Sequence, residues 1–357
     1  MNILHLSRTM GQGGAEKVVV DLCENTKFNF NKIIVLSTGG INVNKLEKNG
    51  IYHEIIPDFE SKKIKDILIT IMTIVRVVRK YNINIIHSHH RMGAFYAQII
   101  RLLNHKIKLV YTAHNVFYNK KLLTRLALSK TEIVAVGEGV KNNLIEFYDL
   151  QANLSKVINN SVKFKEDGDI IRPIECEEDK IVISCIGRLS EQKGIEFLIK
   201  SIKGLVKRNC DINILVLIIG DGEKKEELIS LTQDLSLDRH IKFLGYKSNI
   251  HEYMKFSRFI VSSSLWEGFP LTLIECFAQG KTVIASDIVG NNEIIENGYN
   301  GILFKAKDII ELTNAIVKLS KDDKLLSYLE NNAKKSYDLR FSFKEYIRKY
   351  LDVYEGL

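Results

Sequence analysis

SSSLWEGFPLTLIECFAQG, residues 262–280, contains a strand end, a turn and a helix start in close succession. Three serines follow an apolar run, and Gly268, Phe269 and Pro270 then form a turn. The next eight residues have a helical pattern that Gly280 ends. Proline suits a helix start because its missing N–H would be unpaired there. The order of strand, loop and helix is the repeating unit of an α/β fold.

Two glutamates, Glu267 and Glu275, accompany this turn and the helix after it. A helix N-terminus offers free backbone N–H groups and the positive end of the helix dipole, which favour phosphate. Carboxylates beside a phosphate site are explained if the ligand also carries hydroxyl groups, as a nucleotide-sugar does. Alternatively, one glutamate complements the helix dipole and the other lies on a solvated face.

The length of 357 residues suits two domains, and 45% hydrophobic residues are enough to fill two cores. The five cysteines are scattered without close pairs, which argues against a disulfide framework and a zinc site and favours a reducing cytosol. The apolar runs are too short to span a bilayer, and we expect no signal peptide.

The net charge of +8 is unevenly distributed along the chain. Residues 1–165 contain 24 Lys and Arg against 12 Asp and Glu, whereas the remainder is slightly acidic. A basic half is expected to face an acidic partner, such as an anionic membrane surface or a phosphorylated acceptor, unless its lysines are simply solvated. Nucleic acid is not the expected partner, because it leaves the acidic half and its glutamates unexplained.

Strand and helix patterns alternate in both halves of the chain. Strands are predicted at 2–7, 32–37, 51–56, 83–88, 107–112 and 132–136, and then at 180–186, 212–219, 240–244, 258–262 and 282–285. A polar stretch between them, 157–179, predicts a linker. We therefore predict an α/β fold with two doubly wound Rossmann-like domains, residues 1–165 and 166–340, that face each other across a cleft.

Glycine-containing loops follow several of the predicted strands. Residues 8–16, RTMGQGGAE, match a dinucleotide-binding motif only loosely. Residues 187–194, GRLSEQKG, contain Arg188 and Lys193, whose guanidinium and ammonium groups could both reach a diphosphate. A further turn at 220–222, GDG, lets the backbone approach a ligand closely.

Together these segments resemble the retaining glycosyltransferases of family 4, which have the GT-B fold. The motifs are GGAE at 13–16, HSHH at 87–90, TAHN at 112–115, GRLSEQKG at 187–194, GDGE at 220–223, FLGY at 243–246, EGFPLTLIE at 267–275 and ASDIVGNNEII at 285–295. The resemblance implies that a hexosyl group is transferred from a nucleotide-sugar donor, a UDP-sugar, with its anomeric configuration retained. It also implies that a C-terminal helix near 341–357 completes the first domain.

The resemblance implies roles for individual residues. Glu275 would bind the donor ribose, Glu267 the donor sugar, and Arg188 and Lys193 the diphosphate, while His114 would face the reacting sugar. The catalytic candidates are therefore Glu267, His114, Arg188 and Lys193. Further donor-binding candidates, mostly through the backbone, are Gly13, Gly14, Gly220, Gly245, Gly268, Phe269, Pro270 and Leu271. His89 and Arg91 are candidates for acceptor binding.

We expect no metal and no other cofactor. His87, His89 and His90 follow a predicted strand, but no carboxylate is spaced to complete a metal site with them. Arg188, Lys193 and helix dipoles would supply the positive charge that a metal otherwise provides. Retention could proceed through a covalent intermediate on Glu267 or through front-side attack, which the resemblance favours.

Two predicted helices, 119–130 and 63–80, combine lysines with apolar residues, as helices that lie on an anionic bilayer do. Apolar faces packed on the sheet are the alternative. We predict a cytoplasmic protein, peripheral on the inner face of the cell membrane, whose acceptor is a saccharide linked to polyprenyl diphosphate in surface polysaccharide or capsule synthesis. A nucleotide-sugar 2-epimerase and a non-catalytic saccharide-binding partner subunit remain alternatives.

Overall fold

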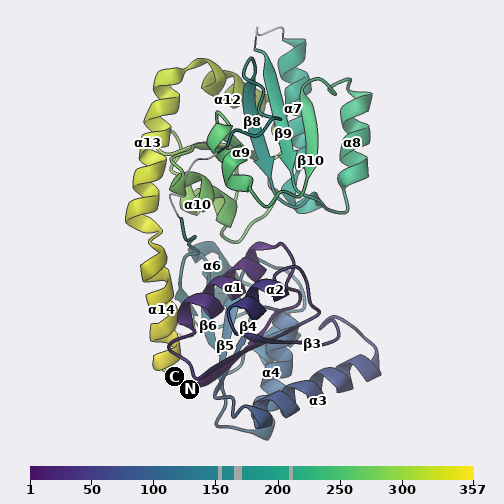
Figure 1. The fold of residues 1–357 in the computed structure, drawn as a ribbon, viewed down its shortest axis with the longest axis vertical. Coiled ribbons are helices and arrows are strands. Elements are labelled where there is room, and N and C mark those ends of the chain that lie inside the picture. The colour runs from purple at the N-terminus through teal and green to yellow at the C-terminus, as the bar shows by residue number, and fades with distance from the viewer. Residues whose placement is uncertain (152–154, 165–170, 209–211) are drawn as a thin grey trace. The chain divides into compact units, whose positions relative to one another are not determined.

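The computed structural model describes residues 1–151, 155–164, 171–208 and 212–357, and it divides into two compact units (Figure 1). The N-terminal unit comprises Met1–Asn160 and Lys344–Leu357, and the C-terminal unit comprises Ser161–Phe343. The sequence had placed these limits at 165 and 341. Cys210 and part of the predicted linker, 165–170, lie outside the described residues.

The N-terminal unit is built on a sheet of seven parallel strands in the order β3-β2-β1-β4-β5-β6-β7. Its strands are β1 (Asn2–Leu6), β2 (Lys32–Ser37), β3 (Tyr52–Ile55), β4 (Ile85–Ser88), β5 (Lys108–Ala113), β6 (Glu132–Ala135) and β7 (Ser155–Val157). Its helices are α1 (Gly14–Thr26), α2 (Val43–Lys48), α3 (Ile64–Lys80), α4 (Arg91–Leu103), α5 (Lys121–Ala127), α6 (Glu138–Glu146) and α14 (Phe343–Glu355).

The C-terminal unit has six parallel strands in the order β10-β9-β8-β11-β12-β13. Its strands are β8 (Ile181–Ile186), β9 (Ile214–Ile219), β10 (Ile241–Gly245), β11 (Ile260–Ser262), β12 (Val283–Asp287) and β13 (Ile302–Lys305). Its helices are α7 (Ile195–Lys207), α8 (Lys225–Asp234), α9 (Ile250–Phe256), α10 (Leu271–Ala278), α11 (Asn291–Ile294), α12 (Ile309–Lys321) and α13 (Asp323–Arg340).

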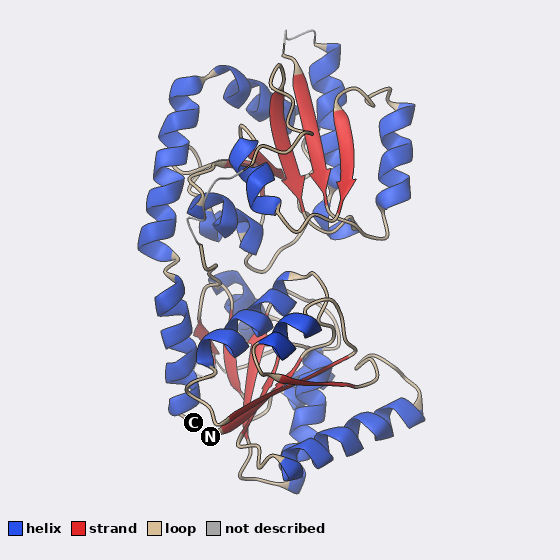
Figure 2. Cartoon of the chain, viewed as in Figure 1, coloured by secondary structure: helices blue, strands red, loops and turns tan. Residues whose placement is uncertain are grey.

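In each unit the second and third strands are added on one side of the first strand, and the remaining strands are added on its other side. This is the doubly wound order. Blue helices flank the red strands of each sheet (Figure 2). The predicted class of two doubly wound α/β units is therefore confirmed. The prediction missed two short strands that lie at sheet edges, β7 and β13.

The two faces of the N-terminal sheet bury different kinds of side chain. One face packs aliphatic residues such as Leu4 and Leu6 against residues of α3 and α4, including Ile74 and Ile100. The opposite face carries His5 and is covered in part by α14, which is yellow in Figure 1. None of the described helices is long and apolar enough to cross a bilayer.

α14 binds the N-terminal sheet through buried tyrosines. The hydroxyl of Tyr354 lies 2.8 Å from His87 Nδ1, and that of Tyr350 lies 3.2 Å from Thr112 Oγ1. Both tyrosines are fully buried, so each hydroxyl needs the partner that the sheet provides. These contacts join the last helix of the chain to β4 and β5.

The loops that follow β8 and β9 pack so closely that only glycine fits at Gly220. A Cβ built on this residue would lie 1.9 Å from the carbonyl oxygen of Gly187, and its φ of +141° is one that other residues rarely adopt. The backbone N–H of Gly220 also donates to the carbonyl of Gly245, at 2.8 Å. Gly245 has a positive φ of +65°, but a Cβ there would meet no atom within 4 Å.

We predict that Gly220→Ala destabilises the protein more than Gly245→Ala. The first substitution combines backbone strain with a clash against Gly187 and should cost about 2–5 kcal/mol. The second adds only the left-handed conformation and should cost about 1–2 kcal/mol. Urea unfolding followed by circular dichroism measures both values, and equal losses would contradict the packing described for the two loops.

Candidate active site

The candidate residues of the C-terminal unit lie where its strand order reverses, between β8 and β11. The loop 187–194 follows β8, and the loop 263–270 follows β11. Three hydrogen bonds to backbone carbonyls join the loops: Leu265 N–H to Gln192 O at 2.7 Å, Ser263 Oγ to Lys193 O at 3.1 Å, and Gln192 Nε2 to Trp266 O at 2.9 Å. The two motifs that the sequence singled out separately therefore form one surface.

Lys193 and Glu267 form a direct ion pair on this surface. Lys193 Nζ donates to Glu267 Oε1 at 2.6 Å, and Ser264 Oγ donates to the same oxygen at 2.8 Å. Gln192 Nε2 donates to Glu267 Oε2 at 3.3 Å. Glu267 is only 7% exposed, so these donors replace water around its carboxylate. The charge of Lys193 is thus already partly balanced within the protein.

Ser264 and Gln192 were not singled out in the sequence, although each lies within a recognised motif. Ser264 precedes Glu267 by three residues, a spacing that lets a hydroxyl reach back to a carboxylate in the same loop. Gln192 lies in the short 3₁₀ turn Glu191–Lys193, which only the fold brings beside the second loop. These two side chains orient Glu267.

Arg188 differs from Lys193 because it is exposed and its guanidinium pairs with no side chain in the described part of the chain.

Helix α10 begins after Pro270, three residues beyond Glu267 in the sequence, and no side chain caps its first turn. The free backbone N–H groups at the start of α10 and the dipole of this helix favour an anion. Glu275, which is also only 7% exposed, lies on α10.

The turn before α10 can offer a ligand only its backbone. The side chains of Phe269 and Leu271 are buried, and the ring of Phe269 packs edge-on against Phe341. A Cβ on Gly290 would lie 2.5 Å from the carbonyl of Gly268, so the loop after β12 supports this turn closely. The backbone roles expected of Gly268, Phe269 and Leu271 stay predictions.

In the N-terminal unit, the first glycine-rich loop is tied to its neighbours. Gly13 precedes α1 and Gly14 begins it. Thr9 Oγ1 donates to Glu16 Oε1 at 2.5 Å, and Met10 N–H donates to Gly39 O at 2.8 Å. These bonds fix the loop between β1 and α1 without using the N–H groups at the start of the helix.

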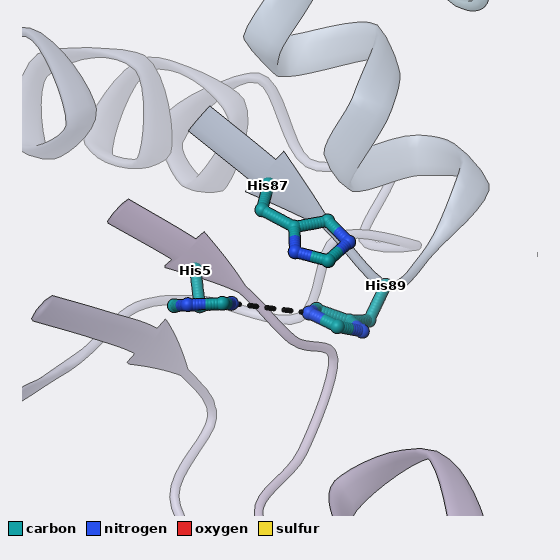
Figure 3. A group of neighbouring side chains, drawn as sticks. All are labelled: His5, His87 and His89. Atoms are coloured by element: carbon teal, nitrogen blue, oxygen red, sulfur yellow. Dashed lines mark hydrogen bonds between the residues drawn. The ribbon is translucent and has the colours of Figure 1, made fainter. Parts of the chain in front are cut away.

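A cluster of histidines lies at the ends of β1, β4 and β5. The parallel register pairs His5 with His87, and His89 follows two residues later on the same side. Figure 3 shows a hydrogen bond between His5 Nδ1 and His89 Nε2, at 3.2 Å, with His87 beside them. His89 Nδ1 lies 3.1 Å from Nε2 of His114.

His5 was not singled out in the sequence, because a single histidine in an apolar strand shows no context. The ring nitrogens of His5, His87 and His89 lie within 4.8 Å of one another and could together hold a metal ion. Both nitrogens of His87 are nevertheless hydrogen-bonded to hydroxyls, Nδ1 to Tyr354 and Nε2 to Thr112, each at 2.8 Å. The expectation that no metal binds stays a prediction.

Burial keeps these histidines neutral. It lowers the pKa of His5 to about 3 and that of His114 to about 4. The pKa values of His87 and His89 are lowered well below 6.5, first by burial and then by the neighbouring imidazoles. Outside the cluster, burial lowers the pKa of His90 to about 4.

The two candidates for acceptor binding are both engaged within the protein. His89 is buried and bonded to His5 and His114. Arg91 Nη1 donates to Asn119 Oδ1 and to the hydroxyl of Tyr148, each at 2.9 Å. The guanidinium of Arg91 also lies 4.0 Å from the ring centre of Phe117. Arg91 therefore holds the start of α4 against the loop before α5.

Two family models match the chain. Residues 12–166 match the model described as Glycosyltransferase Family 4, and residues 167–336 match the model described as Glycosyl transferases group 1. The UDP-Gal:alpha-D-GlcNAc-diphosphoundecaprenol alpha-1,3-galactosyltransferase of Escherichia coli is 26% identical over 311 residues. That match covers 82% of this chain and 80% of the relative.

Another relative is the Campylobacter jejuni N-acetylgalactosamine-N,N'-diacetylbacillosaminyl-diphospho-undecaprenol 4-alpha-N-acetylgalactosaminyltransferase, 24% identical over 341 residues, or 91% of this chain and 92% of the relative. Among solved structures, Anabaena HepE in complex with UDP-glucose is similar with a TM-score of 0.86, at 22% identity and full coverage of both chains. WaaG, a glycosyltransferase involved in lipopolysaccharide biosynthesis, has a TM-score of 0.79 at 12% identity, covering 98% of this chain and 99% of that chain.

We predict that stability falls as the pH is lowered from 8 to 5. The buried histidines stay neutral in the folded protein, whereas in the unfolded chain they take up protons near pH 6.5. Each therefore costs roughly 2 kcal/mol of stability by pH 5. Urea unfolding across this pH range measures the slope.

The slope should be shallower in His114→Gln, which removes one neutral buried histidine. His105 is exposed, so His105→Gln should leave the slope of the parent protein unchanged. A stability that does not vary between pH 8 and 5 would show that the histidines are protonated in the folded state.

Proposed function

Since the chain belongs to the GT-B glycosyltransferases of family 4 and is a glycosyltransferase, we propose that it transfers a hexosyl group from a UDP-sugar with retention of anomeric configuration. The proposed acceptor is a saccharide linked to polyprenyl diphosphate. The names of the Escherichia coli and Campylobacter jejuni relatives, both of which include a diphosphoundecaprenol, support this acceptor, and the HepE complex with UDP-glucose supports a uridine donor.

The observation that carries the proposal is the joined surface between β8 and β11. It combines an exposed cation, Arg188, with the uncapped start of α10 and two buried carboxylates, Glu267 and Glu275. Cations and free N–H groups suit a diphosphate, and carboxylates suit the hydroxyls of a sugar and a ribose. A nucleotide-sugar has all of these groups in one molecule.

Breaking the bond between sugar and diphosphate leaves positive charge on the sugar and negative charge on the leaving diphosphate. Arg188 and the start of α10 would stabilise that negative charge more in the transition state than in the bound donor. Lys193 contributes less free charge than the sequence alone implied, because Glu267 neutralises part of it. These groups let us propose transfer without a metal ion.

Glu267 is better placed to orient the donor than to attack it. Lys193, Ser264 and Gln192 donate to its two oxygens, which lowers the availability of their lone pairs for forming a bond to carbon. We therefore propose front-side attack, in which the leaving diphosphate accepts the proton of the incoming hydroxyl. The carboxylate of Glu267 then holds hydroxyl groups of the donor sugar.

A lipid-linked acceptor requires the enzyme to reach a membrane, and α3 offers a suitable surface. Ile64, Leu68 and Met72 recur every four residues and are 75%, 53% and 61% exposed. Lys62, Lys63 and Lys65 precede or begin the same helix, and their ammonium groups form no ion pair within the described chain. Apolar side chains beside free cations suit an anionic bilayer.

The second candidate helix, α5, is less suited than the sequence indicated. It exposes Leu122 and Leu126, but an acidic neighbour offsets part of the charge of its cations. Lys121 and Arg125 both pair with Asp149, at 2.7 and 3.3 Å. We therefore propose that α3 is the main membrane contact and that the protein is peripheral on the cytoplasmic face.

The proposed reaction is tested by incubating the purified protein with UDP-hexoses and a synthetic polyprenyl-diphosphate saccharide. We expect a product with the donor's anomeric configuration, formed equally well in EDTA, and no change of the donor without acceptor. Loss of transfer in EDTA that magnesium restores would contradict the metal-free mechanism. Epimerisation of the donor alone, seen by NMR, would identify an epimerase instead.

Arg188→Gln should lower kcat by roughly 10²–10³, the usual loss when one preorganised charge-stabilising donor is removed. Arg208→Gln is a matched control. Arg208 directly follows α7, whose other end meets the loop that contains Arg188, and its Nη1 donates to Asn314 Oδ1 at 2.6 Å. Similar activity of the two variants would contradict the role of Arg188.

Membrane binding is tested by flotation with vesicles of phosphatidylglycerol or of phosphatidylcholine. We expect binding to the anionic vesicles only, weakened at least about tenfold in the triple variant Ile64→Ser, Leu68→Ser, Met72→Ser because buried apolar area is lost. The double variant Leu122→Ser, Leu126→Ser is the control on α5 and should bind almost normally. Equal binding to both vesicles would contradict the proposal.

A further inference from the structure

Three imidazoles form a hydrogen-bonded chain that leads outward from the sheet of the N-terminal unit. His5 lies on β1, His89 follows β4 and His114 follows β5. Nδ1 of His5 contacts Nε2 of His89 at 3.2 Å, and Nδ1 of His89 contacts Nε2 of His114 at 3.1 Å. His5 and His89 are buried, whereas His114 is partly exposed.

His5, at the buried end of the three hydrogen-bonded imidazoles, determines which nitrogen of each ring carries the hydrogen. A neutral imidazole has one N–H donor and one acceptor nitrogen, so each bond in the chain fixes the next ring. His5 Nε2 is buried and has no hydrogen-bond partner among the described residues. A buried N–H without an acceptor is rarer than a buried acceptor without a donor, so the hydrogen of His5 belongs on Nδ1.

The remaining hydrogens then follow in order. His5 Nδ1–H donates to His89 Nε2, so His89 carries its hydrogen on Nδ1 and donates to His114 Nε2. His114 in turn carries its hydrogen on Nδ1. That nitrogen has no partner within the described residues and is not among the buried atoms that lack one, so it is open to a ligand.

We propose that His5 and His89 are positioning residues that fix His114 as a neutral donor with its hydrogen on Nδ1. If the proposed function holds, that hydrogen is donated to an oxygen of the bound nucleotide-sugar. His114 would then act as a hydrogen-bond donor and not as a general base, because the nitrogen that faces the ligand carries the hydrogen.

The groups around the chain favour a neutral donor over a charged one. The ring of His87 on β4 packs against those of His5 and His89, and Tyr350 and Tyr354 of α14 also pack against His87. Burial lowers the pKa values of His5, His89 and His114, the neighbouring imidazoles lower that of His89 further, and no carboxylate among the described residues offsets these shifts. A histidine that works as a base commonly has a carboxylate to stabilise its protonated form.

A metal ion is the competing occupant of this cluster, since three histidine nitrogens lie within reach of one ion. Both ring nitrogens of His89 already take part in the hydrogen-bonded chain, so an ion that bound His89 would have to replace one of these bonds. His87 is satisfied by Tyr354 and Thr112 instead. The two occupants therefore exclude each other and can be distinguished by experiment.

The proposal is tested by NMR of the full-length protein labelled with ¹⁵N-histidine, because two-bond nitrogen–proton couplings distinguish the two neutral tautomers. The signals of His114 are identified by their loss in His114→Gln. We expect the Nδ1–H tautomer of His114 from pH 8 to 6. An Nε2–H tautomer or a protonated ring at pH 7 would overturn the proposal, as would one equivalent of bound zinc in the purified protein.

His89→Leu removes the donor to His114 and should shift it towards the Nε2–H tautomer that free histidine prefers. His87→Leu is the matched control, since His87 is also buried and lies on β4, two residues before His89, but is outside the hydrogen-bonded chain. It should leave the tautomer of His114 unchanged. If both variants shift the tautomer, or neither does, the chain does not fix His114. If His89→Leu does not fold, the spectrum of the parent protein alone still tests the assignment.

Enzyme kinetics provide a second test of the histidine chain, and this test depends on the proposed function. His89→Leu should lower kcat/KM for transfer by roughly threefold to tenfold, the worth of one neutral hydrogen bond. If His114 has the expected tautomer but no glycosyl transfer is found, the proposed role of the histidines holds and the proposed function is overturned. If transfer occurs while His114 is in the Nε2–H tautomer, the proposed function holds and the role of the histidines is overturned.

Discussion

Parallel strand pairing is the constraint on which the rest of this structure depends. In a parallel sheet every strand ends at the same edge, so the loops that carry chemistry gather there. The reversal of strand order between β8 and β11 then separates the helices that follow them, which leaves room for a ligand. The joined loops 187–194 and 263–270 occupy this position, and the loops after β1 and β4 occupy its counterpart in the N-terminal unit.

Buried polar groups give each of these edges a fixed geometry. In the C-terminal unit, Glu267 lies in a nearly dry site where Lys193, Ser264 and Gln192 satisfy it. In the N-terminal unit, the hydroxyls of Tyr350 and Tyr354 satisfy Thr112 and His87. An unsatisfied polar group in such a place costs about 1–3 kcal/mol, so these networks hold the side chains in defined positions.

Several functional features could be predicted from the sequence, and others could not. The motif around Glu267 and Glu275 indicated the surface that we propose as the donor site, because a glycine-proline turn before a helix is a local pattern. The pairing of Lys193 with Glu267 was not predicted, since the two residues are 74 positions apart. His5 was missed for the same reason: only the register of β1 with β4 places it beside His87. The sequence offered α3 and α5 alike as membrane contacts, and only the structure shows that Lys121 and Arg125 of α5 pair with Asp149.

The sequence by itself determined the alternation of strands and helices, the division into two α/β units and the resemblance to family 4. All three follow from local residue patterns and from the order of the motifs along the chain. Only the tertiary structure decided which side chains satisfy one another. Strand order and register bring together residues that are far apart in the chain, and local pattern does not contain that information. The ion pair of Lys193 with Glu267 and the chain from His5 to His114 therefore belong to the fold.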